Sequence, residues 1–441
     1  MFWRICYNIV VISLARIVIP LVGLFDRKMR RGIDGRKRLF EKLEEDVARL
    51  KHPSTGAQRI PRVWFHSSSM GEFEQAKPII AELRRRYADI EIIVSFFSPS
   101  GFDHSRSYKH ANIITYIPFD MPENARRFID ILKPTVAIMV RYDVWPNHIW
   151  GLRRKGVPIF IANATLGRDT TRMLPVLKQF HYALYNAIDY ILTVSDSDSK
   201  MFEKFGLDHS IIKTIGDTRY DQVIQRSVEA RTRHLFPENF LDDKQVLVIG
   251  SSWEEDEVQL LPAVKKLLDE HPRLFVILVP HEPNEQNLER IEKRLNGNVP
   301  AIRFSLLGGR RSERFIIVDS IGILTTLYRY AHIAYVGGSF RQGIHNVLEP
   351  AVYGIPVVLG PCHENSQEAK KLVELGAAFV AENDEELYAT FRSFLDDEQW
   401  RIAAGKIASD YVTGNAGATE RFLSYLEKVL ESKSKHSTSQ R

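Results

Sequence analysis

Cysteine is nearly absent from this 441-residue chain, which holds only Cys6 and Cys362. The two lie far apart and show no metal-ligand spacing, which argues against a disulfide framework and favours a reducing compartment. No HExxH pattern and no cluster of cysteine and histidine occurs, so the sequence does not indicate a metal site. No Walker A pattern and no GxGxxG follows a strand-like run. ATP hydrolysis and dinucleotide redox chemistry therefore have no support, and we expect no metal and no cofactor.

A strong charge imbalance is absent too. The formal net charge is +5, which argues against a nucleic-acid-binding protein. Hydrophobic residues make up 44% and charged residues 26%, values that exclude disorder for most of the length. A single hydrophobic core rarely grows beyond about 250–300 residues, so this length predicts two domains.

One long apolar run is present, at residues 2–25. As a helix it would extend about 36 Å at about 1.5 Å per residue, enough to cross a bilayer. Residues 26–38 (DRKMRRGIDGRKR) follow with seven Lys or Arg against two Asp, which predicts that the rest of the chain is cytoplasmic. Arg16, just past the middle of the run, is costly in a spanning helix. Arg4, Asn8 and Arg16 could instead line the polar side of a helix in the membrane interface, and a buried core helix is a third possibility.

From residue 62 onward, short apolar runs alternate with amphipathic helical patterns, which predicts parallel sheets covered on both faces. We expect strands at 62–66, 91–97, 113–118, 135–140, 158–163 and 190–195, and after a charged stretch at 246–252, 275–280, 315–320, 333–339 and 356–360. The fold class is therefore α/β, with two Rossmann-like doubly wound domains, an interdomain cleft and a boundary near 222–244. A long helix at about 398–431 could cross back onto the first half, and the polar tail 432–441 is expected to be disordered. In such folds ligands bind at the carboxyl ends of the strands.

The first strand-end loop of interest is HSSSMGEFEQAKP, at 66–78. Its small residues allow a substrate to approach the backbone, and the helix that follows, expected from about Glu72, offers free N–H groups to an anion. The Glu72 carboxylate can project into the cleft. It can equally do no more than favour the helix N-terminus electrostatically, and the residues alone leave both readings open.

Two further loops carry charge. RYDVWPNHIW (141–150) places Arg141 and Asp143 after a buried strand, either as ligand-binding groups or as an ion pair that closes the loop. GDTRYD (216–221) places Arg219 before the domain boundary, where it suits a phosphate or carboxylate, or is a plain surface arginine.

The most informative loop is YVGGSFRQGIHNVLEPAVYGIPVVLGP, at 335–361. Two glycines follow a strand, and a helix is expected from about Asn346, whose N-terminal N–H groups can hold phosphate oxygens. Glu349 could accept hydrogen bonds from a ribose diol, or act only as the far half of a cap with Asn346. The stretches 279–286 and 319–328 also end strands, and the Ile-Gly-Ile at 321–323 in the second has bare backbone that could pair with a base edge.

Together, HSSSMGE, WPN, NAT, GDTRYD and GGSF…GIHNVLEP, in this order after an N-terminal anchor, resemble the Kdo (3-deoxy-D-manno-octulosonate) transferases that act on the lipid A precursor. The segment GRKRLFEKL (35–43) resembles the family's segment after its anchor. The resemblance implies a GT-B glycosyltransferase at the cytoplasmic face of the inner membrane. It implies CMP-Kdo as donor, a phosphorylated and acylated glucosamine disaccharide as acceptor, and no metal. The domains would be an anchor (1–30), an acceptor domain (31–222) and a CMP-sugar domain (223–431).

The resemblance also implies roles for individual residues. Glu72 matches the family's general base, and Arg219 stands where the family usually has a Lys that stabilises the transition state. The nucleotide-binding positions correspond to Pro280, His281, Ile321, Gly322, Ile323, Asn346, Val347, Leu348 and Glu349. Arg141 departs from the pattern, because the family usually has a Glu there, so its role as a stabiliser is in doubt. Ile323 and His281 also stand where Glu and Arg are common, and the loop 339–345 is one residue short.

The mechanism expected from these residues is inverting transfer. Glu72 takes the proton of the acceptor hydroxyl, while Arg219, the helix at Asn346 and Arg141 neutralise the departing phosphate. Two other functions stay open on the sequence. One is a GT-B enzyme that uses another nucleotide sugar, and the other is a non-catalytic lipid-binding or scaffold protein of the same fold.

Overall fold

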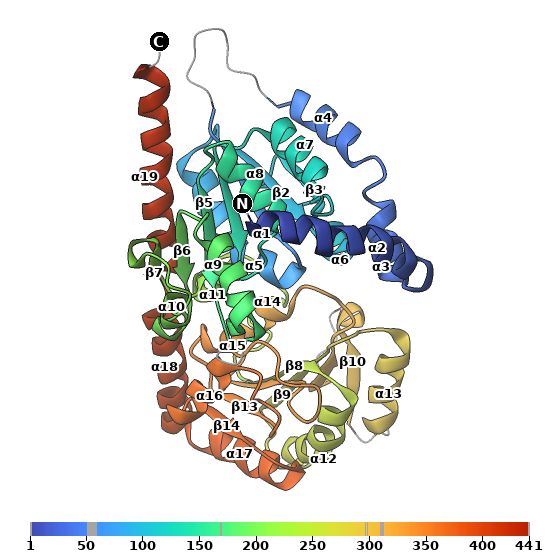
Figure 1. Cartoon of the computed structure of the whole chain (residues 1–441). Coiled ribbons are helices and arrows are strands. Elements are labelled where there is room, and N and C mark those ends of the chain that lie inside the picture. The colour runs from blue at the N-terminus through green and yellow to red at the C-terminus, as the bar shows by residue number, and fades with distance from the viewer. Residues whose placement is uncertain are drawn as a thin grey trace. The chain divides into compact units, whose positions relative to one another are not determined.

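The computed structural model describes residues 2–50, 60–167, 170–295, 297, 299–308 and 313–439 (Figure 1). The chain forms two compact units. The first comprises Met1–Gln222 and Ala416–Arg441, and the second comprises Val223–Asn415. The division after Gln222 lies at the start of the range 222–244 in which the sequence placed a boundary. The second unit is shorter than the expected 223–431, because its last helix is followed by a helix that belongs to the first unit.

The described part of the first unit holds a seven-stranded parallel sheet in the order β3-β2-β1-β4-β5-β6-β7. Its register is set by pairs such as Val63 with Ile92 on one side and with Val136 on the other. The strands are β1 (Arg62–Ser67), β2 (Glu91–Phe96), β3 (Ile113–Tyr116), β4 (Val136–Val140), β5 (Ile159–Ala164), β6 (Tyr190–Thr193) and β7 (Ile212–Thr214). The central strands β2, β4 and β5 are buried throughout, as the apolar runs predict for a sheet covered on both faces.

Helices cover both faces of this sheet. They are α3 (Arg27–Asp34), α4 (Leu39–Ala48), α5 (Met70–Arg86), α6 (Pro99–Ser105), α7 (Pro122–Leu132), α8 (Pro146–Arg154), α9 (Pro175–Tyr185), α10 (Asp196–Glu203) and α19 (Ala418–Ser439), with short 3-10 turns η2 (Thr171–Met173) and η3 (His209–Ile211). The helix α11 (Thr218–Arg231) begins in the first unit and continues into the second. Trp64 points to a core shared with α7, α8 and α9, and its neighbour Phe65 points to a core shared with α5 and α19. The alternation follows from the pleat of the strand.

The described part of the second unit repeats the plan, with strand order β10-β11-β9-β8-β12-β13-β14, all parallel. Its strands are β8 (Gln245–Ser252), β9 (Leu274–Pro280), β10 (Ala301–Arg303), β11 (Phe315–Ile317), β12 (Ile333–Val336), β13 (Val357–Leu359) and β14 (Ala378–Val380). Its helices are α12 (Glu254–Glu270), α13 (Glu285–Leu295), η4 (Phe304–Leu306), α14 (Leu324–Tyr328), α15 (Leu348–Ala351), α16 (Gln367–Glu374), α17 (Asp384–Asp396) and α18 (Glu398–Gly414).

The C-terminal end differs from the sequence expectation. The single helix expected at about 398–431 is two helices, α18 and α19, separated at Gly417, whose φ of +94° interrupts the helix. α19 does cross back to the first unit, where Phe422, Leu423 and Leu426 are fully buried. It also continues to Ser439, so residues 432–439, expected to be disordered, are helical. Residues 440–441 lie outside the described residues.

The N-terminal run is helical throughout, as α1 (Phe2–Cys6), the π-helical segment η1 (Tyr7–Ile12) and α2 (Ser13–Phe25). By length and composition Phe2–Phe25 can cross a membrane, and only 11% of its most apolar stretch is buried. The low burial argues against the reading of this run as a core helix.

Candidate active site

The four motifs of the first unit meet at the carboxyl ends of its strands. The Asn163 side chain, near the carboxyl end of β5, donates to the Thr218 hydroxyl at 2.6 Å, and that hydroxyl donates to the carbonyl of Gln75 in α5 at 2.6 Å. The Trp145 indole donates to Nε2 of His66 at 2.9 Å. The motifs NAT, GDTRYD, HSSSMGE and WPN, which lie up to about 150 residues apart in sequence, are thus joined by hydrogen bonds at one edge of the sheet.

Glu72 lies in the first turn of α5, which begins at Met70, slightly earlier than expected. Its Oε2 accepts from the Ser68 N–H at 2.6 Å and the Ser69 N–H at 3.3 Å, and Ser69 caps the helix in return. This is a capping box, so the electrostatic reading of Glu72 is present in the structure. Oε1 accepts no hydrogen bond from any described residue, so one carboxylate oxygen is not used by the cap.

The environment of Glu72 changes its acidity. The residue is 6% exposed, and burial raises the pKa of its carboxyl above the usual range. The Ser68 and Ser69 N–H groups and the positive charge of Arg141 limit that rise. A buried carboxylate with a raised pKa is a better proton acceptor than an exposed one. The capping box fixes the Glu72 carboxylate in place, and Oε1, which the box does not use, leaves that carboxylate able to act as a base.

His66, next to this loop, is a buried neutral ring. Its Nε2 accepts from Trp145, so its Nδ1 carries the proton and donates to the Ser95 hydroxyl at 2.9 Å. Burial lowers the pKa of His66 to about 3, and the neighbouring His148 adds to the effect. His66 therefore positions the loop and does not exchange protons near neutral pH.

Arg141 and Asp143 do not form the ion pair that the sequence left open, since none joins them within the described residues. Arg141 follows β4 with a φ of +65°, a backbone region that a non-glycine residue rarely adopts. Its Nε is buried and has no hydrogen-bond partner among the described residues. A guanidinium beside Glu72 whose buried Nε has no hydrogen-bond partner among the described residues is suited to an anionic ligand.

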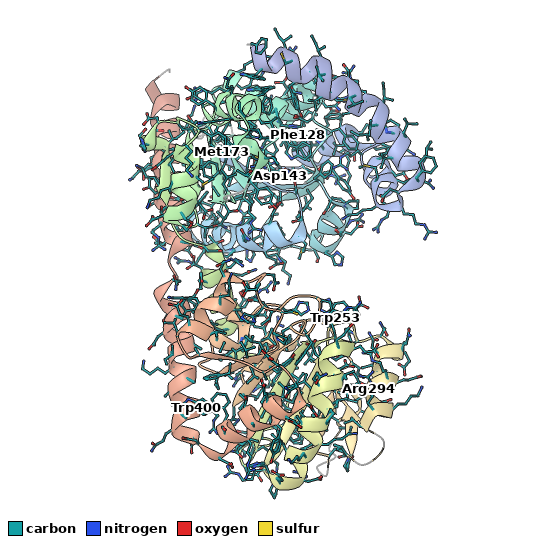
Figure 2. All side chains as sticks on the ribbon, turned by 60° about the horizontal axis from the view of Figure 1, so that its bottom comes forward. Phe128, Asp143, Met173, Trp253, Arg294 and Trp400 are labelled. Carbon is teal, nitrogen blue, oxygen red and sulfur yellow. The ribbon has the colours of Figure 1, made fainter. Side chains whose placement is uncertain are left out.

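Asp143, drawn in Figure 2, lies close enough to Glu72 for the two charges to interact. Burial raises the pKa of Asp143 to about 7, the Glu72 charge adds to the rise, and Arg172 opposes it. Sequence reasoning treated Asp143 only as a partner for Arg141. In the sequence, the one sign that these two carboxyl groups share a site is that an acidic residue follows each of two neighbouring strands.

Arg219 lies at the start of α11 and is held by Asp217. Its Nε donates to the Asp217 carboxylate at 2.8 Å, and a second guanidinium nitrogen lies 2.7 Å from the same oxygen. Asp217 is 5% exposed, whereas the Arg219 side chain is 37% exposed. The Asp217 carboxylate orients the Arg219 guanidinium, and the exposed part of that guanidinium can reach a ligand.

In the second unit a glycine pair follows β12. A Cβ on Gly337 would lie 2.2 Å from the Ser251 carbonyl oxygen, and one on Gly338 would lie 2.4 Å from the Gly343 oxygen. Only glycine therefore fits at these positions. The fully buried Asp256 of α12 holds the loop by accepting from the N–H groups of Gly338 at 2.7 Å and Phe340 at 3.3 Å. Sequence reasoning missed Asp256, which stands in the acidic run that opens α12.

Three rings from three strand ends stack beside this loop. The Trp253 ring, drawn in Figure 2, and the His281 ring have centroids 4.5 Å apart, as do the rings of His281 and His345. The Trp253 indole donates to Nε2 of His345 at 2.9 Å, and burial lowers the pKa of His345 to about 4. The structure thus brings the predicted nucleotide residue His281 next to Trp253 and His345, which sequence reasoning missed.

The remaining predicted positions of the second unit lie at neighbouring loops. α15 begins at Leu348 and is a single turn, shorter than the helix expected from Asn346, so its macrodipole is small. Asn346 caps the Leu348 N–H at 3.1 Å and reaches Glu349 at 3.4 Å, so part of the capping reading holds. Pro280 ends β9, and Val347 and Leu348 are buried. Ile321 is 86% exposed, Gly322 has a φ of +82°, and Ile323 precedes α14.

Comparison with known proteins supports the resemblance. The family model described as 3-Deoxy-D-manno-octulosonic-acid transferase (kdotransferase) matches residues 39–222. The chain is 25% identical over 447 aligned positions to the 3-deoxy-D-manno-octulosonic acid transferase of Haemophilus influenzae, covering 97% of this chain and 99% of that one. It is 29% identical to the transferase of the same name from Chlamydophila psittaci, over 74% of each chain.

Among solved structures, a putative UDP-N-acetylglucosamine 2-epimerase from Listeria monocytogenes aligns with 85% of this chain and 97% of its own, with a TM-score of 0.58 and 15% identity. A likeness at this identity shows the fold alone. The two Rossmann-like sheets agree with the predicted GT-B architecture. The resemblance to the Kdo transferases is therefore confirmed, and the chain is a glycosyltransferase.

Proposed function

We propose that this glycosyltransferase, a relative of the Kdo transferases, moves Kdo from CMP-Kdo to a lipid A precursor at the cytoplasmic face of the inner membrane. The named relative from Haemophilus influenzae aligns with nearly the full length of both chains, which supports the same reaction here. The acceptor would be a phosphorylated, acylated glucosamine disaccharide. The reaction would invert the anomeric centre and need no metal.

The donor side of the proposal rests on the second unit. The glycine pair 337–338 lets a ligand approach backbone N–H groups, and Asp256 keeps that loop in one conformation. The rings of Trp253, His281 and His345 offer flat faces on which a cytosine can stack. The Glu349 carboxylate, held near Asn346, would accept hydrogen bonds from the ribose diol. The exposed backbone at 321–323 would meet the base edge.

The acceptor side rests on Glu72. The acceptor hydroxyl oxygen attacks the anomeric carbon of Kdo and forms the new glycosidic bond. Its proton passes to Oε1 of Glu72, which is not used by the capping box. The bond between the anomeric carbon and the CMP phosphate breaks, and its electron pair leaves with the phosphate. Attack from the face opposite CMP gives inversion.

Two arginines would balance the negative charges of this reaction. Arg219, oriented by Asp217, suits the phosphate that gains charge as the donor bond breaks. Arg141, with its unpartnered Nε beside Glu72, suits a carboxylate or phosphate of a substrate. Its positive charge also keeps Glu72 ionised and ready to accept a proton. This role replaces the one that a Glu at position 141 would have.

The observation that carries the proposal is the fixed, half-satisfied carboxylate of Glu72 at the junction of four motifs. The test is incubation of the purified chain with CMP-Kdo and a tetraacylated lipid A precursor, with products separated by mass. We expect the precursor to gain one or more Kdo units, and the mass also gives their number. An unmodified precursor at full donor occupancy would refute transfer and favour the non-catalytic lipid-binding alternative that the unusual Arg141 motivates.

A further inference from the structure

The N-terminal helix carries its polar side chains on the side that faces the first unit. The Tyr7 hydroxyl donates to the Asp120 carboxylate at 2.9 Å. The side-chain amides of Asn8 and Asn147 exchange hydrogen bonds at 2.8 and 3.1 Å. Arg16 forms an ion pair with Glu123 of α7. These residues include two of the three polar positions that the sequence assigned to one side of an interfacial helix.

Aromatic contacts extend this attachment toward the start of the helix. The rings of Trp3 and Tyr7 both contact Phe180 of α9, with centroids 6.1 and 5.7 Å apart. Tyr7 also packs edge-on against Trp150 of α8 at 5.8 Å. The first half of the helix therefore lies along α7, α8 and α9, on the surface of the unit (Figure 1).

The length of the attached part decides how the helix can meet a membrane. From Trp3 to Arg16 the attached stretch covers about 20 Å at about 1.5 Å per residue. The nine residues after Arg16 could reach only about 13 Å, whereas a hydrocarbon core is about 30 Å thick. The far end is also tied back, because Arg30 of α3 donates to the Gly23 carbonyl at 3.0 Å and Arg31 pairs with Asp103 of α6 at 2.6 Å. No part of the helix long enough to span is free of the folded unit.

The opposite side of the helix is apolar and exposed. Its large exposed side chains lie along the whole length and include Phe2, Ile9, Val10, Leu14, Ile17 and Phe25. Soluble proteins rarely expose a continuous apolar surface of this kind, which marks a site of protein or membrane contact. A helix with one polar and one strongly apolar face is typical of segments that lie in the plane of the interface.

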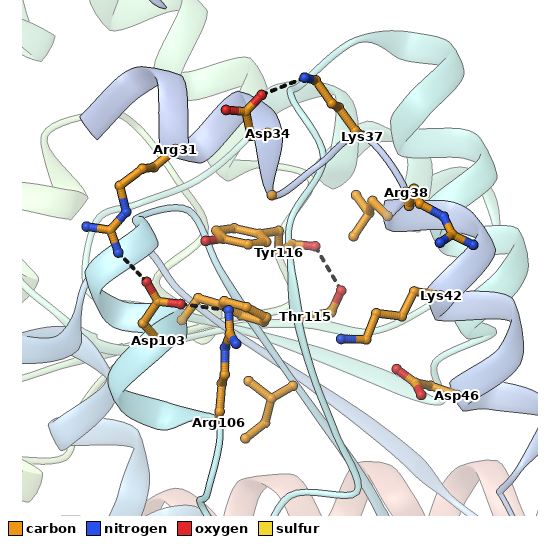
Figure 3. Close-up of a pocket in the computed structure, with 14 residues that line it drawn as sticks. Arg31, Asp34, Lys37, Arg38, Lys42, Asp46, Asp103, Arg106, Thr115 and Tyr116 are labelled. Carbon is orange, nitrogen blue, oxygen red and sulfur yellow. Dashed lines mark hydrogen bonds and ion pairs between the residues drawn. The ribbon is translucent and has the colours of Figure 1, made fainter. Parts of the chain in front are cut away.

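Positive charge next to the helix favours a lipid surface over a protein partner. α3 and α4 follow the helix and, with α6 and β3, line an open cavity of about 750 Å³ (Figure 3). Five basic and three acidic side chains surround it. Arg31 and Arg106 share Asp103, and Lys37 pairs with Asp34, whereas Lys42 has no ion pair among the described residues. A basic cavity of this size beside an apolar helix suits anionic headgroups.

We infer that residues 2–25 form a monotopic anchor, which lies in the plane of one leaflet with its apolar face in the headgroup–acyl boundary and does not cross the bilayer. The basic cavity around Lys42 binds anionic headgroups of the same leaflet. The N-terminus then stays on the side of the membrane where the first unit lies. This inference deepens the membrane attachment in the proposed function but needs neither the donor nor turnover.

Labelling of single cysteines tests the topology. In a Cys6→Ser, Cys362→Ser background, Phe2→Cys is exposed to a membrane-impermeant maleimide in intact spheroplasts. We expect no labelling until detergent is added, as for a control chain that keeps only the exposed Cys362. Labelling of Phe2→Cys in intact spheroplasts would show that the helix spans, and would overturn the inference while leaving transfer activity untouched.

Probe depth gives a second readout. The same background with Ile9→Cys, Ile17→Cys or Phe25→Cys carries an environment-sensitive fluorophore in vesicles of phosphatidylcholine and phosphatidylglycerol. An in-plane helix places all three probes at one depth. A spanning helix separates the first and last by about 24 Å along the bilayer normal, and such a gradient would contradict the inference.

Vesicle flotation tests the two parts of the surface. Ile9→Asp and Ile17→Asp should each weaken binding about tenfold, because each removes an exposed apolar side chain that the membrane would bury. The matched control is Ile402→Asp, an equally exposed isoleucine on α18. Lys42→Gln should weaken binding to anionic vesicles about fivefold and leave binding to phosphatidylcholine alone unchanged. Equal losses for Ile402→Asp and Ile9→Asp, or unchanged binding in both helix variants, would refute the anchor.

Discussion

The strand ends of the two units carry opposite kinds of chemistry on the same sheet architecture. In the first unit ionisable side chains dominate, with the buried Glu72 close to the partly buried Asp143, Arg141 beside Glu72, and Arg219 held by Asp217. In the second unit rings, amides and bare backbone dominate, and the fully buried carboxylate of Asp256 holds that backbone in place. The first set can move a proton and balance charge, and the second can hold a nucleotide without reacting with it.

The difference agrees with what each half of the proposed reaction would need. A base must have a pKa shifted toward the working pH, and burial near other charges provides such a shift. A nucleotide site must offer donors and flat faces but no group that competes for the reacting proton. Substitutions in the first unit should therefore change turnover, and substitutions in the second should change donor affinity.

Glu72→Gln should produce the largest effect. The amide keeps the shape of the carboxylate but cannot accept the proton, so kcat should fall by about 10²–10⁴-fold. The affinity for CMP, measured by calorimetry, should be unchanged. The matched control is Glu82→Gln on the same helix, which removes only ion pairs with Arg85 and Arg86. Normal turnover in Glu72→Gln would remove the base from the mechanism.

Arg219→Ala should come next, with a loss of about 10²-fold in kcat, because the departing phosphate loses a charged donor. Since Asp217 is then left buried without its partner, thermal unfolding must be measured alongside. Arg219→Lys keeps the charge and should recover part of the rate. Arg392→Ala, on the exposed side of α17, is the control. Equal rates for the alanine and lysine variants would mean that Arg219 acts only through structure.

His281→Ala should give a smaller effect of the other kind. Loss of the outer ring removes a stacking face, so CMP should bind about tenfold more weakly while kcat at saturating donor is retained. Calorimetry measures the affinity for CMP, and steady-state kinetics measure kcat. The control is His209→Ala, in the first unit. A fall in kcat with unchanged CMP affinity would contradict the claim that the second unit determines donor affinity rather than turnover.

Asp143→Asn should have the smallest effect, on stability. The pKa of Asp143 is about 7 in the folded chain against an ordinary 3.8, so the folded state binds more protons between about pH 4 and pH 7. Stability from this group is therefore lost as pH rises through that window, and an amide avoids the loss. At pH 8 the variant should be more stable than wild type by roughly 1–4 kcal/mol, with little difference at pH 4. Urea unfolding at both pH values checks this, and a wild-type advantage at pH 8 would contradict it.

The sequence predicted most of the sheet architecture, because central parallel strands are continuous apolar runs. The expected runs at 62–66, 91–97 and 275–280 match β1, β2 and β9 within two residues at each end. The missed strands, β7, β10 and β14, are each three residues long and stand at sheet edges. An edge strand pairs on one side only, so it needs a shorter and less apolar run.

From the sequence, candidate site residues could be predicted only where they stand in a recognisable motif. Glu72, Arg141 and Arg219 were found from their places after strands, and their roles remain predictions. The ring stack joins three loops that lie far apart in sequence, at Trp253, His281 and His345. No local sequence pattern predicts such a stack. The raised pKa of Asp143 likewise depends on burial and on Glu72, which are properties of the folded chain. The unpartnered Nε of Arg141 required coordinates as well.

The most direct test of the division between the units is the melting temperature of wild type and Glu72→Gln with CMP, UDP or ADP. A ligand that binds only the folded chain raises its melting temperature in proportion to occupancy. We expect CMP to stabilise both proteins equally and UDP and ADP to stabilise neither. Stabilisation by UDP or ADP but not by CMP, or loss of the CMP effect in Glu72→Gln, would contradict it.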